Sequence, residues 1–284
     1  MSQLLTPSLI CACAGWNVPS LINEELLEQF PSLAQVQGEI NSSKNAEVAL
    51  THLERYAQFL TGVEIDSSFY RSHLPSTYAR WRNSVPAEFR FSVKVPKAIT
   101  HVLRLKNCEY ELQKFILETS SLEEKLGCLL IQLPPSLPFD YGIAHKFLTQ
   151  IKQLSKTQLA LEPRHASWFE PASFDLLTEQ EICLVAADPG IAGYDALQDN
   201  FPITASTVYL RLHGSPDMYR SSYDKVYLEN LSLRLAILLK QGKHIWCVFD
   251  NTAEGAAFPN AVTIQRQQNP TPTKSLARPH KATI

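Results

Sequence analysis

The chain has 284 residues, of which 45% are hydrophobic and 19% are charged, so it has ample material for a core and too little charge for a disordered polymer. The formal net charge of −2 excludes a global basic field, and the bulk charge therefore supports neither a nucleic-acid partner nor binding to a membrane surface. The apolar N-terminal run has no Lys or Arg ahead of it, and no stretch reaches the length of a membrane span, so we expect neither a signal peptide nor a membrane anchor.

The six cysteines follow no metal-binding or redox spacing. None forms a C-x-x-C pair, and Cys11, Cys13, Cys183 and Cys247 lie within apolar, strand-like runs. Small buried thiols of this kind are typical of reduced cytosolic proteins. We therefore expect a cytoplasmic protein with unpaired cysteines.

Eight short β-rich runs recur along the chain and are separated by helical patterns. In chain order they are LICACAGW (9–16), GVEIDSSF (62–69), FRFSVKVP (89–96), CLLIQLPP (128–135), QLALEPR (158–164), CLVAADP (183–189), TVYLRLHG (207–214) and IWCVFDNT (245–252). Helical periodicity is clear over residues 47–60, over 140–155, and in a leucine stripe from Leu228 to Leu238 that stops at Gly242. Strand and helix alternating eight times predict one α/β domain of the (β/α)8 TIM-barrel type. The main alternative, an open doubly wound sheet, lacks support because no G-x-G-x-x-G or Walker loop follows a strand.

Three segments depart from this alternation. The Ser/Asn-rich stretch Gln35–Ala46 is polar and resembles an insertion in the first β-to-α connection. Residues 190–206 show no helical period, which predicts a sixth helix that is short or missing. We assign residues 1–267 to the barrel and predict that 268–284, a basic tail rich in Pro and Thr, is disordered.

Polar and charged residues gather at the carboxyl ends of nearly all these strands. Because side chains alternate along a strand, one parity faces the barrel interior. On that parity lie Glu64, Asp66 and Ser68, Ser92 and Lys94, Gln132, Glu162 and Arg164, Asp188, Arg211 and His213, and finally Asp250 or Asn251. Unpaired charges in a dry core cost several kcal/mol each, whereas barrel enzymes keep their sites at this mouth. The pattern therefore predicts a ligand-accessible mouth.

Candidate roles follow from side-chain chemistry. The proposed acid–base residues are Glu64, Glu162, His213 and Asp188, with His213 preferred because it is the one strand-borne imidazole. The proposed ligand-binding residues are Lys94, Arg164, Arg211, Asp66, Gln132, Trp16, Trp168, Asp250 and Asn251. For each charge, a structural pairing is the alternative: Glu64 with Lys94, and Glu162 with Arg164 or Arg211. The aromatic residues could wall the pocket, but loop packing is favoured.

The same segments resemble the YecE-like proteins, the family called domain of unknown function number 72. The resemblance spans residues 9–264 and rests on ordered motifs: AGWNVPS (14–20), HLERYAQFLTGVEIDSSFYR (52–71), FRFSVKVPKAITH (89–101), LGCLLIQLPPSLPFD (126–140), LALEPRHASWF (159–169), YLRLHG (209–214) and VFDNTAEGAAFPNA (248–261). It implies a (β/α)8-type barrel in an intracellular bacterial protein and no established reaction. Asp66 and Asp250 stand where the family pattern usually has Asn, and Gln35–Ala46 and the basic tail lie outside that pattern.

The leading functional hypothesis is an enzyme that acts on a small anionic substrate, phosphorylated or sugar-like, with Arg and Lys binding the anion. One alternative is a metal-dependent phosphodiesterase or a nuclease of the DNA-repair type. Three cations at the mouth and one strand histidine weigh against it, so we expect no metal and no cofactor. Another alternative is a barrel that binds a ligand or a partner without turnover. Unpaired, pKa-shifted Glu64 or Glu162 would favour an enzyme, and full ion pairing would favour binding or structure. The sequence leaves the oligomeric state open.

Overall fold

The computed structural model describes residues 8–22, 24–44 and 50–268, and each of the eight predicted runs contains a strand. The strands are β1 (Leu9–Cys13), β2 (Gly62–Ile65), β3 (Arg90–Lys94), β4 (Leu126–Gln132), β5 (Gln158–Glu162), β6 (Cys183–Leu184), β7 (Ala186–Asp188), β8 (Thr207–Leu212) and β9 (His244–Phe249). The apolar runs form strands because they are too short for helices and are bounded by polar turns.

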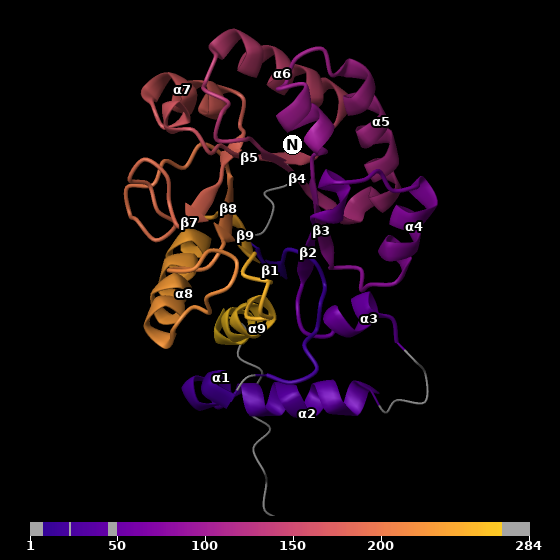
Figure 1. The fold of residues 1–284 in the computed structure, drawn as a ribbon, viewed down its shortest axis with the longest axis vertical. Helices are drawn as coiled ribbons and strands as arrows, with labels where there is room; N and C mark the ends of the chain where they lie inside the picture. Colours follow the sequence, from indigo (N-terminus) through magenta and orange to yellow (C-terminus); the bar gives the residue numbers. More distant parts are fainter. Residues whose placement is uncertain (1–7, 23, 45–49, 269–284) are drawn as a thin grey trace, which may run out of the picture.

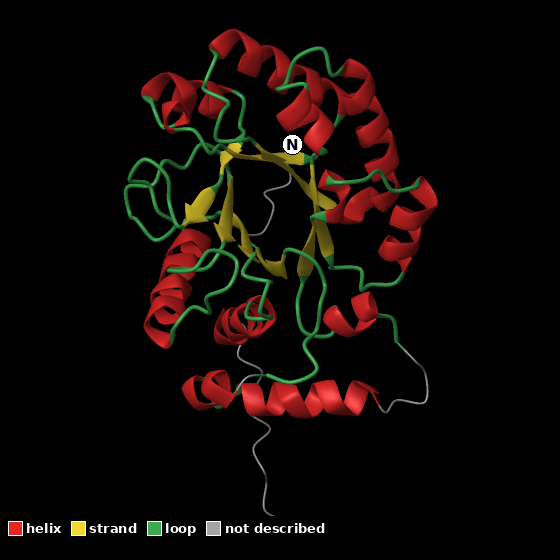
Figure 2. Ribbon diagram, viewed as in Figure 1, coloured by secondary structure: helices red, strands yellow, loops and turns green. Residues whose placement is uncertain are grey.

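All strand pairs are parallel and form two sheets, one in the order β2-β3-β4-β5-β6 and the other in the order β1-β9-β8-β7. The sheets adjoin twice: only Val185 separates β6 from β7, and an isolated bridge joins Ala14 to Glu64 beyond the end of β1. Viewed along the short axis, the strands stand around a ring (Figure 2). The parallel α/β fold is thus confirmed, while the hydrogen-bonded ladders themselves form two sheets rather than one closed sheet.

Helices surround the strands (Figure 1). They are α1 (Glu24–Gln29), α2 (Leu33–Lys44), α3 (His52–Tyr56), α4 (Pro75–Asn83), α5 (Glu109–Thr119), α6 (Tyr141–Leu154), α7 (Pro171–Glu179), α8 (Lys225–Lys240) and α9 (Ala257–Gln268), with short turns η1 (Ser67–Phe69), η2 (Ala98–Val102), η3 (Ser120–Lys125) and η4 (Ala166–Trp168). The predicted helices over 140–155 and around Leu228–Leu238 are α6 and α8, and the chain leaves α8 through Gly242 at a φ of +80°. Within the predicted 47–60 segment, the described part is helical only in α3.

The segments that depart from the alternation have different outcomes. The described part of Gln35–Ala46 lies between β1 and α3, in the predicted connection, but it is helical: it belongs to α2, which buries Leu33, Val36 and Ile40 against the core. These positions are three and four residues apart, so they form one apolar stripe within an otherwise polar sequence. Residues 190–206 contain no helix and only an isolated bridge between Ile191 and Tyr194, as predicted. The tail beyond Gln268 lies outside the described residues.

The strands separate two apolar regions because their side chains alternate. Leu129 and Ile131 of β4 pack outward against the helices, whereas Cys128 and Leu130 face the ring interior, where Trp246 also lies. The Tyr209 ring stacks on Trp246 at a centroid distance of 5.8 Å. Tyr209 thereby extends the apolar packing of the interior toward the carboxyl ends of the strands. Charged side chains fill the interior near the carboxyl ends of the strands.

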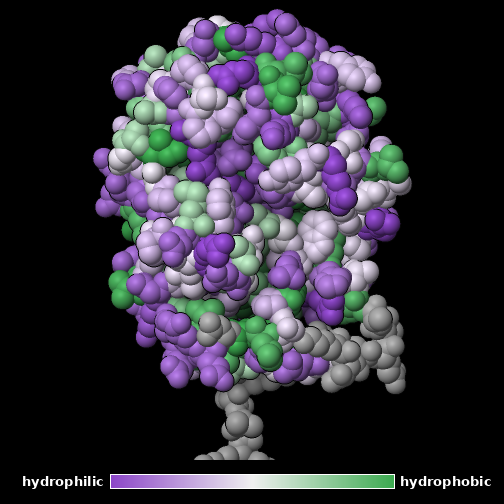
Figure 3. All heavy atoms as spheres, viewed as in Figure 1, coloured by the Kyte–Doolittle hydropathy of each residue, from purple (hydrophilic) through white to green (hydrophobic). Residues whose placement is uncertain are grey.

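The remaining sequence-based expectations about environment concern cysteines and membranes. All six cysteines are buried and unpaired. Within the described ranges, no helix combines the length and apolarity needed to cross a bilayer. The face shown in Figure 3 is mainly hydrophilic, with apolar residues scattered among polar ones.

Candidate functional site

Arg211 of β8 lies at the centre of a buried charge network. Its guanidinium is 1% exposed, and its Nε and Nη2 donate to the Glu64 carboxylate at 2.7–3.2 Å. Nη1 donates to Oε2 of Glu162 at 3.2 Å, and Nη2 lies 3.0 Å from Oδ2 of Asp250. Burial would lower the pKa of Arg211, but the charges of Asp250, Glu64 and Glu162 raise it well above its ordinary value. Arg211 is therefore a permanent cation that holds three carboxylates from β2, β5 and the end of β9.

Tyr209 and Ser92 form a second polar layer, which contacts the network from the interior of the ring. Tyr209 lies two residues before Arg211 on β8, so its side chain points to the same side of the sheet. Its hydroxyl donates to Oε2 of Glu64 at 2.8 Å and lies 2.9 Å from Oγ of Ser92. We did not predict Tyr209 as a site residue, although its parity with Arg211 and His213 was a usable signal.

His213 lies directly after β8 with both ring nitrogens facing carboxylates. Nδ1 is 2.9 Å from Oδ2 of Asp250, and Nε2 is 2.9 Å from Oε1 of Glu162. The imidazole is fully buried, and its orientation is fixed from both sides. In the proton-transfer arrangement an acid holds one imidazole nitrogen and the other nitrogen faces the reacting group, so a ligand would have to displace Glu162 from Nε2 before His213 could exchange a proton with it.

Arg164 connects this pair to the mouth. Its Nη2 donates to Oε1 of Glu162 at 2.6 Å and lies 2.8 Å from Nε2 of His213. Its Nε is buried and has no hydrogen-bond partner among the described residues. An unpaired buried donor costs free energy, and it marks a position where a ligand oxygen would be favourable.

Lys94 and Asp66 form the opposite edge of the network. The Lys94 ammonium bonds Oδ1 of Asp66 at 2.6 Å and lies 4.4 Å from the ring centre of Phe69. The Asp66 side chain is 30% exposed, compared with 12% for Arg164 and 13% for Asp250. Solvent therefore reaches the network through these three residues, while Glu64 and Glu162 lie beneath them.

Two acids of the network, Glu162 and Asp250, are held in their charged form. Burial by itself would raise the pKa of the Glu162 carboxyl, but Arg211, Arg164 and His213 lower it well below its usual range. Burial likewise opposes ionisation of Asp250, whose pKa is nevertheless lowered by Arg211 and by the His213 hydrogen bond. Glu64 and Glu162 are both fully paired, and Glu64 pairs with Arg211 rather than with Lys94. By the criterion set from the sequence, this pairing favours binding or positioning over carboxylate acid–base chemistry.

The structure thus brings most of the sequence-predicted site residues into one network of direct contacts. Its members are Glu64, Asp66, Lys94, Glu162, Arg164, Arg211, His213, Asp250 and Gln132, whose amide donates to Glu162 at 3.0 Å. The contacts join residues up to 147 positions apart in the sequence.

Four predicted site residues are engaged elsewhere. Asp188 accepts a hydrogen bond from the Tyr223 hydroxyl at 2.6 Å, and burial raises the pKa of its carboxyl. The Asn251 amide donates to Ser221 and Asn260 and ties two loops together, while Trp168 donates to the Leu137 carbonyl. Trp16 packs edge-on against Trp81. The indole rings serve loop packing, as favoured from the sequence, and the structure does not place Asp188 or Asn251 in the charge network.

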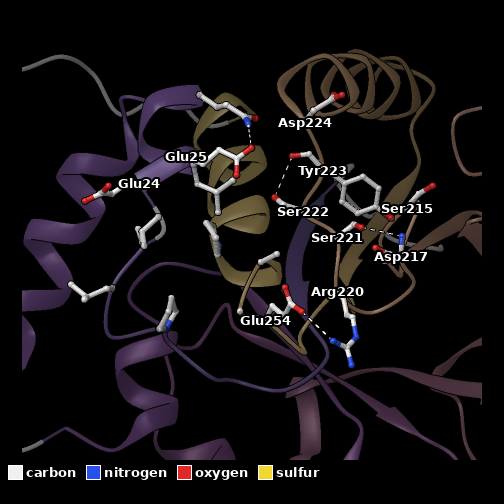
Figure 4. Close-up of a pocket in the computed structure, with 18 of the residues that line it drawn as sticks. Glu24, Glu25, Ser215, Asp217, Arg220, Ser221, Ser222, Tyr223, Asp224 and Glu254 are labelled. Atoms are coloured by element: carbon white, nitrogen blue, oxygen red, sulfur yellow. Dashed lines mark hydrogen bonds and ion pairs between the residues drawn. The ribbon is translucent and has the colours of Figure 1, made fainter.

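A separate groove of about 800 Å³ lies beside the loop that follows β8 (Figure 4). Its labelled walls come from α1, from residues 215–224 and from Glu254, and Arg220 bonds Glu254 across it. Its lining includes no member of the charge network.

Comparison with known proteins identifies the family. The model for the family described as protein of unknown function DUF72 matches residues 34–283. The chain belongs to this family. The matched range includes Gln35–Ala46 and the tail, so the expectation that both lie outside the DUF72 pattern is not supported.

Two curated relatives resemble the chain over different lengths. The UPF0759 protein YecE of Escherichia coli is 28% identical over 127 residues, which are 44% of this chain and 46% of YecE, so the match spans less than half of that relative. The UPF0759 protein YunF of Bacillus subtilis is 26% identical over 73% of this chain and 83% of its own length.

Solved DUF72 structures share the fold. A DUF72 family protein of Thermotoga maritima matches with a TM-score of 0.69 and 22% identity over 91% of this chain and 98% of that chain. One from Enterococcus faecalis matches with a TM-score of 0.68 and 21% identity over 93% and 96%. At these identities the likeness concerns the fold alone.

We predict that Arg211→Met destabilises the protein by about 3–5 kcal/mol, because it leaves buried carboxylates without their cation. Urea denaturation measures this loss. The matched control is Arg220→Met, which breaks an exposed pair whose Arg side chain is 68% exposed and should cost less than about 1 kcal/mol. Equal losses for the two variants would contradict the central role of Arg211.

We also predict that acid destabilises the native state through Asp250 and Glu162. Their pKa values are lowered on folding, so their stabilisation is complete above the unfolded pKa values near 4 and is lost as the pH falls through the folded ones. Asp250→Asn should therefore lose less free energy of unfolding between about pH 5 and pH 2 than the wild type. Glu109→Gln, at an exposed ion pair, should follow the wild type. An unchanged slope for Asp250→Asn would count against the coupling to Arg211.

Proposed function

We propose that the mouth binds a small anionic ligand, phosphorylated or sugar-like, through Arg164, and that His213 exchanges a proton with this ligand. The observation that carries the proposal is the buried, unpartnered Nε of Arg164 beside an imidazole that Asp250 and Glu162 hold. A guanidinium edge is well suited to phosphate and carboxylate oxygens. The proposal treats the two sheets as one functional (β/α)8-type barrel whose mouth lies at the carboxyl ends of the strands.

Each network member has a distinct role in this proposal. Arg164 binds the anion, and Lys94 adds positive charge at the opposite edge. His213 is the acid–base group, because Arg211 and Arg164 hold Glu162 as an anion, and the Glu64 carboxylate is already occupied by Arg211 and Tyr209. Arg211 is a positioning residue whose donors are already taken by carboxylates, so we no longer assign it to anion binding.

The metal-dependent phosphodiesterase is less well supported. Glu64, Glu162 and Asp250 would have to leave Arg211 to ligate an ion, and no cluster of metal-ligand type occurs in the part of the chain that the structure describes. A cytoplasmic location stays a prediction.

Binding can be tested with phosphate and sulfate. At about ten times its Kd, the anion should stabilise the wild type by about 1.4 kcal/mol, or a Tm increase of about 3 °C. Arg164→Met should remove this gain, whereas Arg90→Met, at the opposite ends of the strands, should keep it. An anion effect that survives in Arg164→Met would place the site elsewhere, and no effect in the wild type would remove the proposal.

A second candidate, ligand binding without turnover, is favoured by the complete pairing of Glu64 and Glu162. A metabolite and nucleotide library can be screened by thermal shift, and each stabilising compound incubated with the protein and followed by mass spectrometry. If His213 is catalytic, His213→Gln should slow product formation at least about 100-fold while keeping the thermal shift. If the wild type forms no product from any stabilising compound, the result favours ligand binding without turnover.

A further inference from the structure

An exposed aromatic ring lies beside the charge network and has no role in it so far. Tyr219 is 42% exposed, and its ring packs edge-on against the His213 imidazole at a centroid distance of 5.5 Å. The His213 Nε2 is in turn 2.8 Å from Arg164 Nη2. An exposed ring and a guanidinium with a free donor thus both contact one buried imidazole.

Tyr219 is held in place by the backbone around it. Its N–H donates to the His213 carbonyl at 2.5 Å, and its carbonyl accepts from Ala253 at 3.0 Å. Tyr219 adopts a φ of +69°, which costs free energy for a non-glycine residue and is sustained only by such contacts. The loop begins at Gly214 with a φ of +92°, where a Cβ would lie 2.9 Å from the Ser221 carbonyl. The backbone of Tyr219 is therefore held at the mouth, and its ring lies against His213.

We propose that the ligand of this mouth is a ring-bearing phosphate ester, a nucleotide or a sugar phosphate, whose ring stacks on Tyr219 while its phosphate lies at Arg164. The inference rests on the proposed function and narrows its ligand class. Bases and sugar rings both present a face to an aromatic side chain, and a held aromatic ring binds them at low entropic cost. Met218 of the same loop is 39% exposed and adds apolar surface beside the ring. A bare anion would leave this surface unused.

The test compares four probes: inorganic phosphate, glycerol phosphate, glucose 6-phosphate and adenosine monophosphate. Their affinities for the full chain are measured by calorimetry. We expect the preferred ring-bearing ester to bind about tenfold more tightly than glycerol phosphate. Tyr219→Ala should abolish that preference, and Tyr219→Phe, which keeps the ring, should retain it. Tyr110→Ala is the control, because Tyr110 is 74% exposed on α5 and touches no member of the network.

The outcomes separate this inference from the proposed function. If glycerol phosphate binds as tightly as both ring-bearing esters, or if Tyr219→Ala keeps the preference, the inference is overturned while anion binding stands. If no phosphate compound binds the wild type, the proposed function fails and the inference with it. Tighter binding of adenosine monophosphate than of glucose 6-phosphate identifies the stacked ligand ring as a base. The reverse order identifies it as a sugar.

Discussion

The burial of the Arg211 guanidinium among carboxylates is the interaction on which the rest of the site depends. A buried cation is tolerated only when acids surround it, and here they come from β2, β5 and the end of β9. The network therefore ties strands of both sheets together across the ring interior. Buried ion networks add little net stability compared with an apolar core of the same volume, although breaking them is costly. The network is therefore better explained by the side chains that it positions, His213 and Arg164, than by a gain in the stability of the fold.

That positioning determines which chemistry the mouth can support. Because Arg211 and Arg164 keep Glu162 charged, this carboxylate serves to orient His213 and not to exchange protons. In the proposed function, proton transfer is therefore assigned to one imidazole and anion binding to the free donor of Arg164. Tyr219 contacts the same imidazole as Arg164 and provides the surface on which we propose that the ligand ring stacks.

Asp66 and Asp250, which the resemblance places where the family pattern is expected to have Asn, fit into this charge balance. Asp66 pairs with Lys94, and Asp250 bonds both His213 and Arg211. Each added negative charge therefore meets a cation or an imidazole already present. In this chain the site contains four acids, three cations and one histidine in mutual contact. With an Asn at either position, the remaining contacts of Arg211 to Glu64 and Glu162 would still hold the cation.

Sequence alone determined the eight β-rich runs that contain the strands and the polar character of their carboxyl ends, because alternation along a strand is a local property that fixes which side chains share a face. It also indicated the missing sixth helix. Tertiary structure decided the partners: Glu64 meets Arg211 rather than Lys94 because β2 and β8 face each other across the ring, 147 residues apart in sequence. It also turned Asp188 toward Tyr223, Asn251 toward Asn260 and Trp168 into loop packing. The helix at Leu33–Lys44 was missed because its apolar stripe is narrow and becomes visible only against the surface that it covers.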